Sequence, residues 1–269
     1  MLLARSTFGL LGYALGYIFG LIPTKSRLIC SLQLKKFINR EDITPLVFAH
    51  IGQLIFETLF KCPADEAFIA PDLDEALKLL SKGKGILALT AHYGAWDLLG
   101  AYAVRRGAPL YAIGRPARRF QWILEWLRNK HGIKTIWRVG KGGAQEIEEI
   151  LLEGNVVAAV IDQDTRVKSI PVKFFNEEAS TPVTVVRMAL SLNIPIISAF
   201  IRRDKKKFII TTKELSGNTP EDILSKFNQQ LEEQIRISPE QWVWFHQRWR
   251  TKNDGTRLSY HDYIDFLRS

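Results

Sequence analysis

The sequence predicts an α/β fold with a mostly parallel central sheet flanked by helices. From residue 84 onward, short apolar runs of strand length alternate with longer segments of helical periodicity, the pattern of strands and helices packed in layers. Two of the short runs, residues 85–90 ("GILALT") and 155–162 ("NVVAAVID"), are almost continuously apolar, as strands buried in a parallel sheet are. With 46% hydrophobic residues among 269, the chain can enclose a full core.

The first expected element is an apolar helix within residues 1–23 ("MLLARSTFGLLGYALGYIFGLIP"). Its uninterrupted apolar part is shorter than the roughly 20 residues that cross a bilayer comfortably, and it shows no signal-peptide cleavage site. Gly12, Gly16 and Gly20 recur every four residues, a spacing that lets helices approach closely. Because the basic segments "TKSR" and "LKK" follow, we expect a membrane anchor, spanning or at the interface; a buried core helix is the alternative.

Residues 24–269 are expected to form a single α/β domain that begins with helices at 24–62. Strands are then expected at 85–90, 109–114, 134–139, 155–162, 194–203 and 207–215. Helices are expected at 95–106, 120–132, 143–154 and 181–193. The segments "TPED" (219–222) and "SPEQ" (238–241) combine a capping residue with a proline at the first helical position, so we expect them to start the last two helices.

The charge of the chain is strongly basic and unevenly distributed. The formal net charge is +9, and ten lysines and arginines lie between Arg105 and Lys141 against one acid, Glu125. Such an excess favours an acidic partner: a nucleic acid, an anionic membrane, or an acidic protein or substrate. No nucleic-acid-binding motif or interleaved aromatic platform accompanies it, so we expect no nucleic-acid partner.

Cysteine usage indicates neither a disulfide framework nor a metal site. Cys30 and Cys62 are the two cysteines, and they lie far apart, outside any metal-ligand spacing. We therefore expect no bound metal, and the pattern fits a reducing compartment.

The stretch "TAHYGAWDLLG" (90–100) places His92 and Asp97 five positions apart, between an expected strand and an expected helix. On one continuous helix five residues turn through about 500°, so the two side chains meet only if the backbone changes state between them. An imidazole held by a carboxylate suits general-base removal of a hydroxyl proton. No G-x-S-x-G nucleophile follows the strand, so the histidine would activate an acceptor directly. A histidine that only caps the helix is the alternative.

Other polar segments are expected at the edge of the sheet where parallel strands end. Arg115 in "IGRPARR" (113–119) follows one strand, and "VIDQDTR" (160–166) ends another with acids, where α/β sheets bind ligands. Thr181 lies before an expected helix N-terminus, where backbone N–H groups bind anions. The segment "SPEQWVWFHQRWR" (238–250) is rich in tryptophan, and these side chains suit either core packing or substrate contact.

In order and spacing these blocks resemble the bacterial lipid A biosynthesis acyltransferases of the HtrB/LpxL type, from about Gly85 to Lys252. The closing block P-E-Q-W-x-W-x-H-x-R-W is the most specific part, and Phe174, Phe175 and Ala179 match a further family segment. The resemblance implies a glycerolipid-acyltransferase-like fold and an H-x4-D catalytic pair, His92 and Asp97, although lipid A enzymes usually carry Glu in place of this Asp. It implies substrate-binding roles for Arg115 (followed by Pro116), Asp162, Gln163, Ser180, Thr181, His246 and Arg248.

The activity so implied is that of an O-acyltransferase of the inner membrane, with its active site on the cytoplasmic side. It would move a fatty acyl chain from a carrier thioester to a hydroxyl of a lipid A precursor or related glycolipid, without cofactor or metal. The expected partners are the lipid acceptor, an anionic membrane surface and acyl carrier protein, with acyl-coenzyme A as the other possible donor. The alternatives are another acceptor, such as lysophosphatidate or a phosphoinositide mannoside, and a non-catalytic basic lipid-binding protein at the membrane.

Overall fold

The computed structural model describes residues 4–60, 63–115, 121–137 and 142–269. In this part of the chain a seven-stranded sheet has the strand order β1-β9-β8-β2-β5-β3-β4. Its strands are β1 (Phe68–Ile69), β2 (Ile86–Thr90), β3 (Leu110–Gly114), β4 (Lys134–Trp137), β5 (Val156–Val160), β8 (Ile196–Asp204) and β9 (Lys207–Glu214). All neighbours run parallel except β8 and β9, so the expected mostly parallel sheet is confirmed. A separate antiparallel hairpin joins β6 (Ser169–Phe174) to β7 (Glu177–Pro182).

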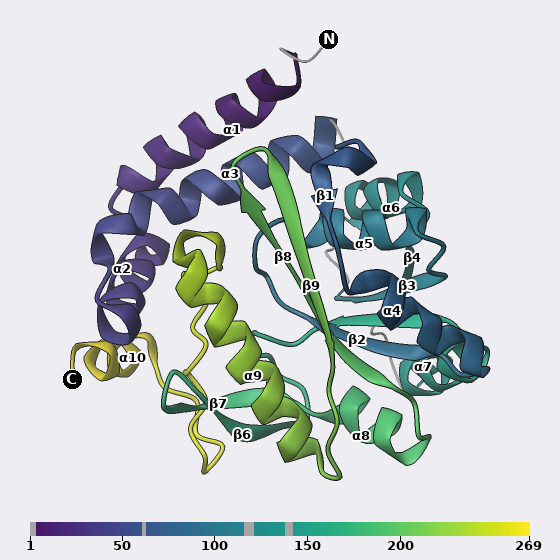
Figure 1. Ribbon diagram of the computed structural model, residues 1–269. Coiled ribbons are helices and arrows are strands. Elements are labelled where there is room, and N and C mark those ends of the chain that lie inside the picture. Colours follow the sequence, from purple (N-terminus) through teal and green to yellow (C-terminus); the bar gives the residue numbers. More distant parts are fainter. Residues whose placement is uncertain (1–3, 61–62, 116–120, 138–141) are drawn as a thin grey trace.

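Helices cover both faces of the sheet, with α8 and α9 on one side and α4 and α5 on the other (Figure 1). Side chains on β2 alternate between the two layers, because Leu87 and Leu89 join the cluster of α9 whereas Ile86 and Ala88 join that of α5. The helices are α1 (Ala4–Leu21), α2 (Lys25–Ile38), α3 (Thr44–Phe60), α4 (Leu73–Leu77), α5 (Trp96–Arg105), α6 (Gln121–Lys130), α7 (Gly142–Leu152), α8 (Thr184–Ser191), α9 (Pro220–Ile237) and α10 (Tyr260–Arg268).

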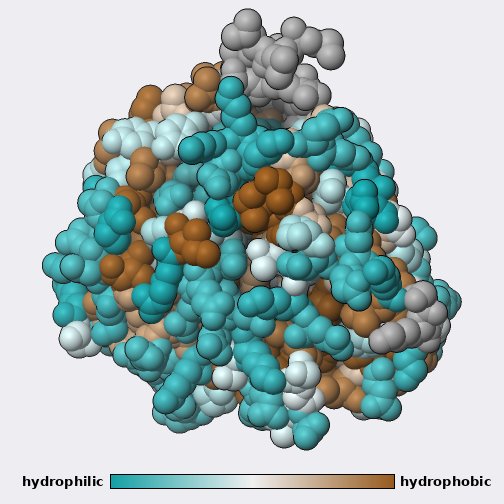
Figure 2. Space-filling view, viewed as in Figure 1, coloured by the Kyte–Doolittle hydropathy of each residue, from teal (hydrophilic) through white to brown (hydrophobic). Residues whose placement is uncertain are grey.

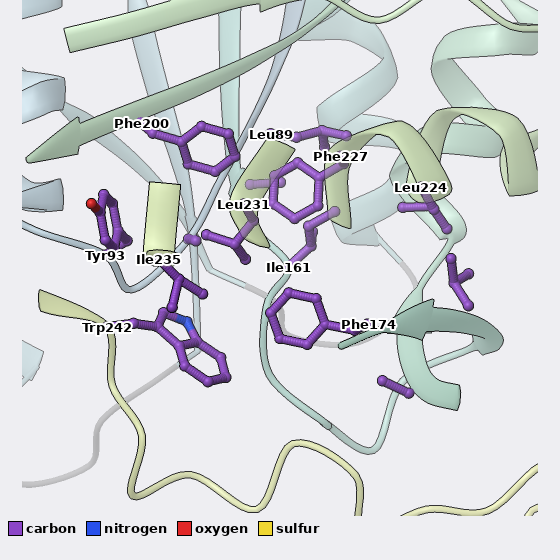
Figure 3. Packing of buried hydrophobic residues seen from close by; sticks show 14 of the residues in the cluster. Leu89, Tyr93, Ile161, Phe174, Phe200, Leu224, Phe227, Leu231, Ile235 and Trp242 are labelled. Atoms are coloured by element: carbon purple, nitrogen blue, oxygen red, sulfur yellow. The ribbon is translucent and has the colours of Figure 1, made fainter. Parts of the chain in front are cut away.

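The largest core cluster forms where α9 lies on the sheet. Figure 3 shows Phe227 and Leu231 of α9 close to Leu89 of β2 and Phe200 of β8, and each of these four side chains is at most 2% exposed. The helix begins as expected at the "TPED" segment, where Thr219 and Asp222 form a capping box. Burial of this apolar stripe fixes α9 over the centre of the sheet.

Two expected helix starts are wrong, and both errors fall near the site described below. The "SPEQ" segment forms only a short 3-10 turn, Pro239–Gln241, because Trp242 leaves it in an extended conformation; the last helix begins after Ser259 instead. The segment starting at residue 181 is not yet helical either, since Thr181 pairs with Ile170 in the β6–β7 hairpin and α8 starts at Thr184.

The N-terminal apolar segment forms α1, which packs along α3 on one face. A Cβ atom built on Gly16 would lie 2.2 Å from the Phe48 carbonyl oxygen, so the glycine spacing does allow close helix packing. The other face of α1 exposes large apolar side chains, Leu10 and Ile18 among them at 60% and 58%. No helix in the described ranges is long and apolar enough to cross a membrane, so the expected spanning anchor is not found. The division of the chain after residue 23 stays a prediction.

Replacing Gly16 by alanine is expected to destabilise the α1–α3 pair. In an open helix position this change stabilises by roughly 0.5–1 kcal/mol, whereas here the added methyl group meets backbone and should cost about 1–3 kcal/mol. The expected result is a lower midpoint of thermal unfolding together with faster tryptic cleavage after Lys25, which starts the next helix. Leu15→Ala, on the exposed face of α1, serves as the control; equal effects of both variants would contradict the packing argument.

Candidate active site

The turn that carries His92 is held from two sides. It lies between the end of β2 and the start of α5, as the sequence predicts, and the C-terminal segment closes over it. Val243 N–H donates to the His92 carbonyl oxygen at 3.2 Å, and Gly94 N–H donates to the Gln241 carbonyl oxygen at 2.8 Å. Gly94 has a φ of 59°, and a Cβ atom there would lie 1.8 Å from the Ile201 carbonyl oxygen, so the turn requires glycine at this position.

Asp162 binds His92 directly. Thr90 of β2 and Val160 of β5 are register partners, so the residues two positions beyond each strand meet at the same edge of the sheet. The His92 Nδ1 atom lies 2.8 Å from Asp162 Oδ1, and the His92 backbone N–H donates to Oδ2 at 2.9 Å. The indole N–H of Trp242 donates to the same Oδ2 at 2.8 Å. A nearly buried carboxylate thus has its oxygens occupied by three N–H groups.

These contacts assign the protonation of the pair. Since Nδ1 donates its proton to the carboxylate, Nε2 is the basic nitrogen, on a side chain that remains 28% exposed. Burial lowers the pKa of His92, but the charge and hydrogen bond of Asp162, helped by the charge of Asp97, raise this pKa overall above its ordinary value. Burial also acts to raise the pKa of Asp162, and the contacts with His92 and Trp242 outweigh it and lower that pKa. The result is an ionised acid beside a histidine suited to accept a proton.

Asp97 lies where the expected helix at 95–106 places it, but it is not the hydrogen-bond partner of His92. It stands in the first turn of α5, and no hydrogen bond links it to His92 in the described part of the chain. Burial raises the pKa of Asp97, while the charges of Arg128 and His92 act in the opposite direction. The carboxylate that orients the imidazole is therefore that of Asp162, and Asp97 acts on it only through charge. A catalytic role for Asp97 stays a prediction.

A second polar group joins the closing segment to β7, and it consists of Arg248, Ser180 and Thr181. Arg248 is 1% exposed and donates to the Ser180 carbonyl oxygen at 2.5 Å and to the Thr181 hydroxyl at 2.8 Å. Burial lowers the pKa of Arg248 to about 10, so it stays charged at neutral pH. The Thr181 hydroxyl itself donates to the Ala179 carbonyl oxygen at 2.9 Å, so it is not the open anion site expected at a helix N-terminus.

The other expected binding residues lie around the same edge of the sheet. Arg115 directly follows β3 and is exposed, and Gln163 follows Asp162; Pro116, Arg118 and Arg119 lie outside the described residues. His246 is affected by the charges of both Asp162 and Arg248, and burial lowers its pKa to about 4, so its ring is neutral. Its Nε2 atom is buried and has no hydrogen-bond partner among the described residues.

An apolar cavity of about 100 Å³ extends from this edge beneath α5, and we call it the α5 cavity. Small side chains of neighbouring strands form its floor, because Ala88, Ala112, Ala158 and Ala199 all point toward α5. Thr90, Trp96, Asp97, Ile113, Arg128 and Val160 line it toward the carboxyl ends of the strands. The edge of the Trp96 ring also contacts the His92 ring, with the centroids 5.2 Å apart, so the cavity adjoins the imidazole.

The layered fold, the imidazole held by a buried carboxylate and the adjoining apolar cavity define an α/β enzyme with an acid–base site. Residues 35–251 match the family described as bacterial lipid A biosynthesis acyltransferase. The chain therefore belongs to this family, and it is an acyltransferase.

Curated relatives agree with this assignment. The chain is 25% identical over 234 residues to a lipid A biosynthesis acyltransferase of Haemophilus influenzae, covering 82% of this chain and 72% of the relative. It is 24% identical over 201 residues to a lipid A biosynthesis palmitoleoyltransferase of Escherichia coli, covering 72% of this chain and 65% of the relative. A lipid A biosynthesis acyltransferase of Shigella flexneri matches to the same extent.

The role of Trp242 was missed from the sequence, where the tryptophans of the closing block suit core packing as well as substrate contact. Trp242 packs in the core, where it is 1% exposed, and its indole N–H also binds Asp162, the partner of His92. The Tyr93–Trp242 bridge explains why the ring reaches this carboxylate. The available signal was the specificity of the P-E-Q-W block, which marks the segment but not its partner.

A histidine titration followed by NMR separates the two acids. Asp162→Asn removes the charge that raises the pKa of His92 and leaves the effect of burial, so this pKa is expected to fall. Asp97→Asn should lower it less, because Asp97 acts without a hydrogen bond. His50, whose pKa burial lowers to about 4, is the internal reference. A larger fall in Asp97→Asn would show that Asp97 is the orienting carboxylate.

Proposed function

We propose that this acyltransferase moves a fatty acyl chain from a carrier thioester to a hydroxyl of a lipid A precursor or related glycolipid, with His92 as general base. The observation that carries the proposal is the His92–Asp162 contact, which leaves Nε2 as the basic nitrogen of a side chain that is 28% exposed. The names of the relatives support the acceptor class, and one of them is named a palmitoleoyltransferase.

The proposed reaction is a single transfer without an enzyme nucleophile. His92 Nε2 takes the proton of the acceptor hydroxyl while its oxygen attacks the thioester carbonyl carbon. The Asp162 carboxylate stabilises the imidazolium that forms, and the charge of Asp97 acts in the same sense. Collapse of the tetrahedral intermediate breaks the carbon–sulfur bond, and the imidazolium returns its proton to the departing thiolate. Arg115 and nearby backbone N–H groups bind the acceptor phosphate or the developing oxyanion. No cofactor takes part.

The α5 cavity is the proposed site for the donor acyl chain. It starts beside Thr90 and Trp96, next to the imidazole, and its lining is apolar apart from Thr90, Asp97 and Arg128. A chain that enters it from the carboxyl edge of the sheet would leave its thioester near His92. The depth under α5 would then set the preferred chain length.

The exposed face of α1 is the proposed membrane contact. Figure 2 shows hydrophobic side chains along the upper left outline, where α1 lies in Figure 1. Leu11, Leu15 and Phe19 are each 50% exposed, and an apolar helix face of this kind inserts into the interface of a bilayer. The proposed location is the cytoplasmic side of the inner membrane, since the carrier thioester is a cytoplasmic substrate.

Removal of the base is expected to abolish transfer. His92→Ala should lower kcat/KM by about 10²–10⁴ or more, the usual contribution of a positioned base, while leaving the protein folded. The assay follows labelled acyl transfer to a lipid A precursor, to lysophosphatidate and to a phosphoinositide mannoside. Retained transfer in His92→Ala would overturn the mechanism. Preference for another acceptor would replace the substrate class, and binding without any transfer would favour the lipid-binding alternative.

A matched tryptophan pair tests the Asp162 contact in the same assay. Trp242→Phe removes an N–H that binds the carboxylate and should lower kcat/KM about tenfold, since a hydrogen bond to a charged group contributes about 1.5–3 kcal/mol. Trp244→Phe removes an N–H that binds the Pro239 carbonyl oxygen and is the control. Equal losses would mean that the two rings only support packing.

The basic segment between Arg105 and Lys141 is the proposed dock for acyl carrier protein. Electrostatic steering raises association rates by roughly 10–10³ and weakens as salt shortens the screening length to about 8 Å at physiological strength. Transfer from the carrier should therefore fall with added salt, mainly in kcat/KM, and Arg118→Glu with Arg119→Glu should reproduce the loss at low salt. Acyl-coenzyme A on identical vesicles is the control donor. An equal loss with both donors would assign the segment to the membrane or the acceptor.

A further inference from the structure

A second apolar cavity, larger than the first, lies on the other face of the sheet. It has a volume of about 300 Å³ and lies between the sheet and the first turns of α7 and α8, so we call it the α7–α8 cavity. Its lining includes Ile136 and Ala159 from the sheet, Ile161 directly after β5, Ile147 from α7, and Val185 and Met188 from α8. A volume of this size falls at the lower end of the range for ligand pockets, about 300–1,000 Å³.

The two cavities meet at the edge of the sheet that carries His92. Ile113 at the end of β3 and Val160 at the end of β5 line both of them. Val160 is 37% exposed, and it lies two residues before Asp162, so the shared rim adjoins the contact between His92 and Asp162. Two apolar chains that enter from this rim, one above and one below the sheet, would both leave their polar ends near the imidazole.

One polar atom in the α7–α8 cavity lacks a partner. The Thr165 hydroxyl is buried and makes no hydrogen bond among the described residues, although its residue lines this cavity. A buried hydroxyl without a partner destabilises the structure, and a ligand oxygen that accepts from it would remove this cost. A donor chain carries no polar group beyond its thioester. Acceptor chains, in contrast, are joined to their sugar through ester or amide groups, which can accept from this hydroxyl.

We propose that the α7–α8 cavity holds a hydrocarbon chain of the acceptor lipid, with Thr165 donating to the carbonyl group of that chain. This inference rests on the proposed function for the identity of the acceptor, but not for the binding of the chain. The sheet then separates donor and acceptor chains, and only their polar ends meet at the rim beside His92. Acceptor selection thereby becomes a property of α7 and α8, independent of the α5 cavity that takes the donor chain.

The test is photolabelling of the full-length protein with dodecanoic acid that carries a diazirine near its chain end, followed by peptide mass spectrometry. Labels in α5 report the α5 cavity, and labels in α7 report the α7–α8 cavity. A lipid A precursor should compete for the α7–α8 cavity and reduce labelling of α7 about tenfold, which corresponds to about 1.4 kcal/mol of binding free energy. Dodecanoyl-coenzyme A should instead reduce labelling of α5. The experiment measures binding and not transfer, so it tests this inference even if the proposed reaction is wrong.

Variants that fill the cavity provide the matched comparison. Val185→Trp should reduce labelling of α7 about tenfold and leave labelling of α5 unchanged. Ala144→Trp, from an exposed position at the start of α7, is the second variant if the first fails to fold, and Arg187→Trp on the exposed side of α8 is the control. Absence of label in α7 of the unchanged protein, or its removal by dodecanoyl-coenzyme A and not by the lipid A precursor, would overturn the proposal.

Discussion

Three N–H groups from two distant parts of the chain converge on the Asp162 carboxylate, and the arrangement of the site depends on them. Two come from His92 at the end of β2, and the third comes from Trp242 in the closing segment. A nearly buried carboxylate must have such partners, because an unpaired buried charge is costly. The same contacts set the orientation and basicity of His92. The chemistry of the imidazole therefore depends on how the closing segment packs against Asp162.

The parallel sheet explains why these groups can meet. Strands β2 and β5 are neighbours, and their carboxyl ends lie at the same edge, where both the imidazole and its carboxylate follow directly. Small residues on one face leave space under α5, and the ends of α7 and α8 leave space on the other. Both spaces open toward the rim formed by Ile113 and Val160. The architecture therefore combines a histidine held in one orientation with two apolar cavities that share a rim at the same edge of the sheet.

Periodicity predicted the mostly parallel sheet, the position of His92 in a turn and the start of α9, because these follow from local patterns. The partner of His92 could not be obtained in this way. Asp97 is near in sequence and lies in the first turn of α5, but it makes no hydrogen bond to His92 in the described part of the chain, whereas Asp162 is distant in sequence and close through strand register. The absence of a helix after the "SPEQ" segment could not be predicted either. The capping sequence favours a helix, but the bridge between Tyr93 and Trp242 holds the chain extended instead.

The glycine at position 94 limits which substitutions this sequence can accept. Any other residue there would need a left-handed backbone conformation and would also bring its first carbon against the Ile201 carbonyl oxygen in β8. Relief would require moving either a central strand or the turn that holds the imidazole, and no single neighbouring substitution provides that room, because the obstacle is backbone. Synonymous codon changes are therefore tolerated at position 94. An amino acid substitution there requires a change in the geometry of the site.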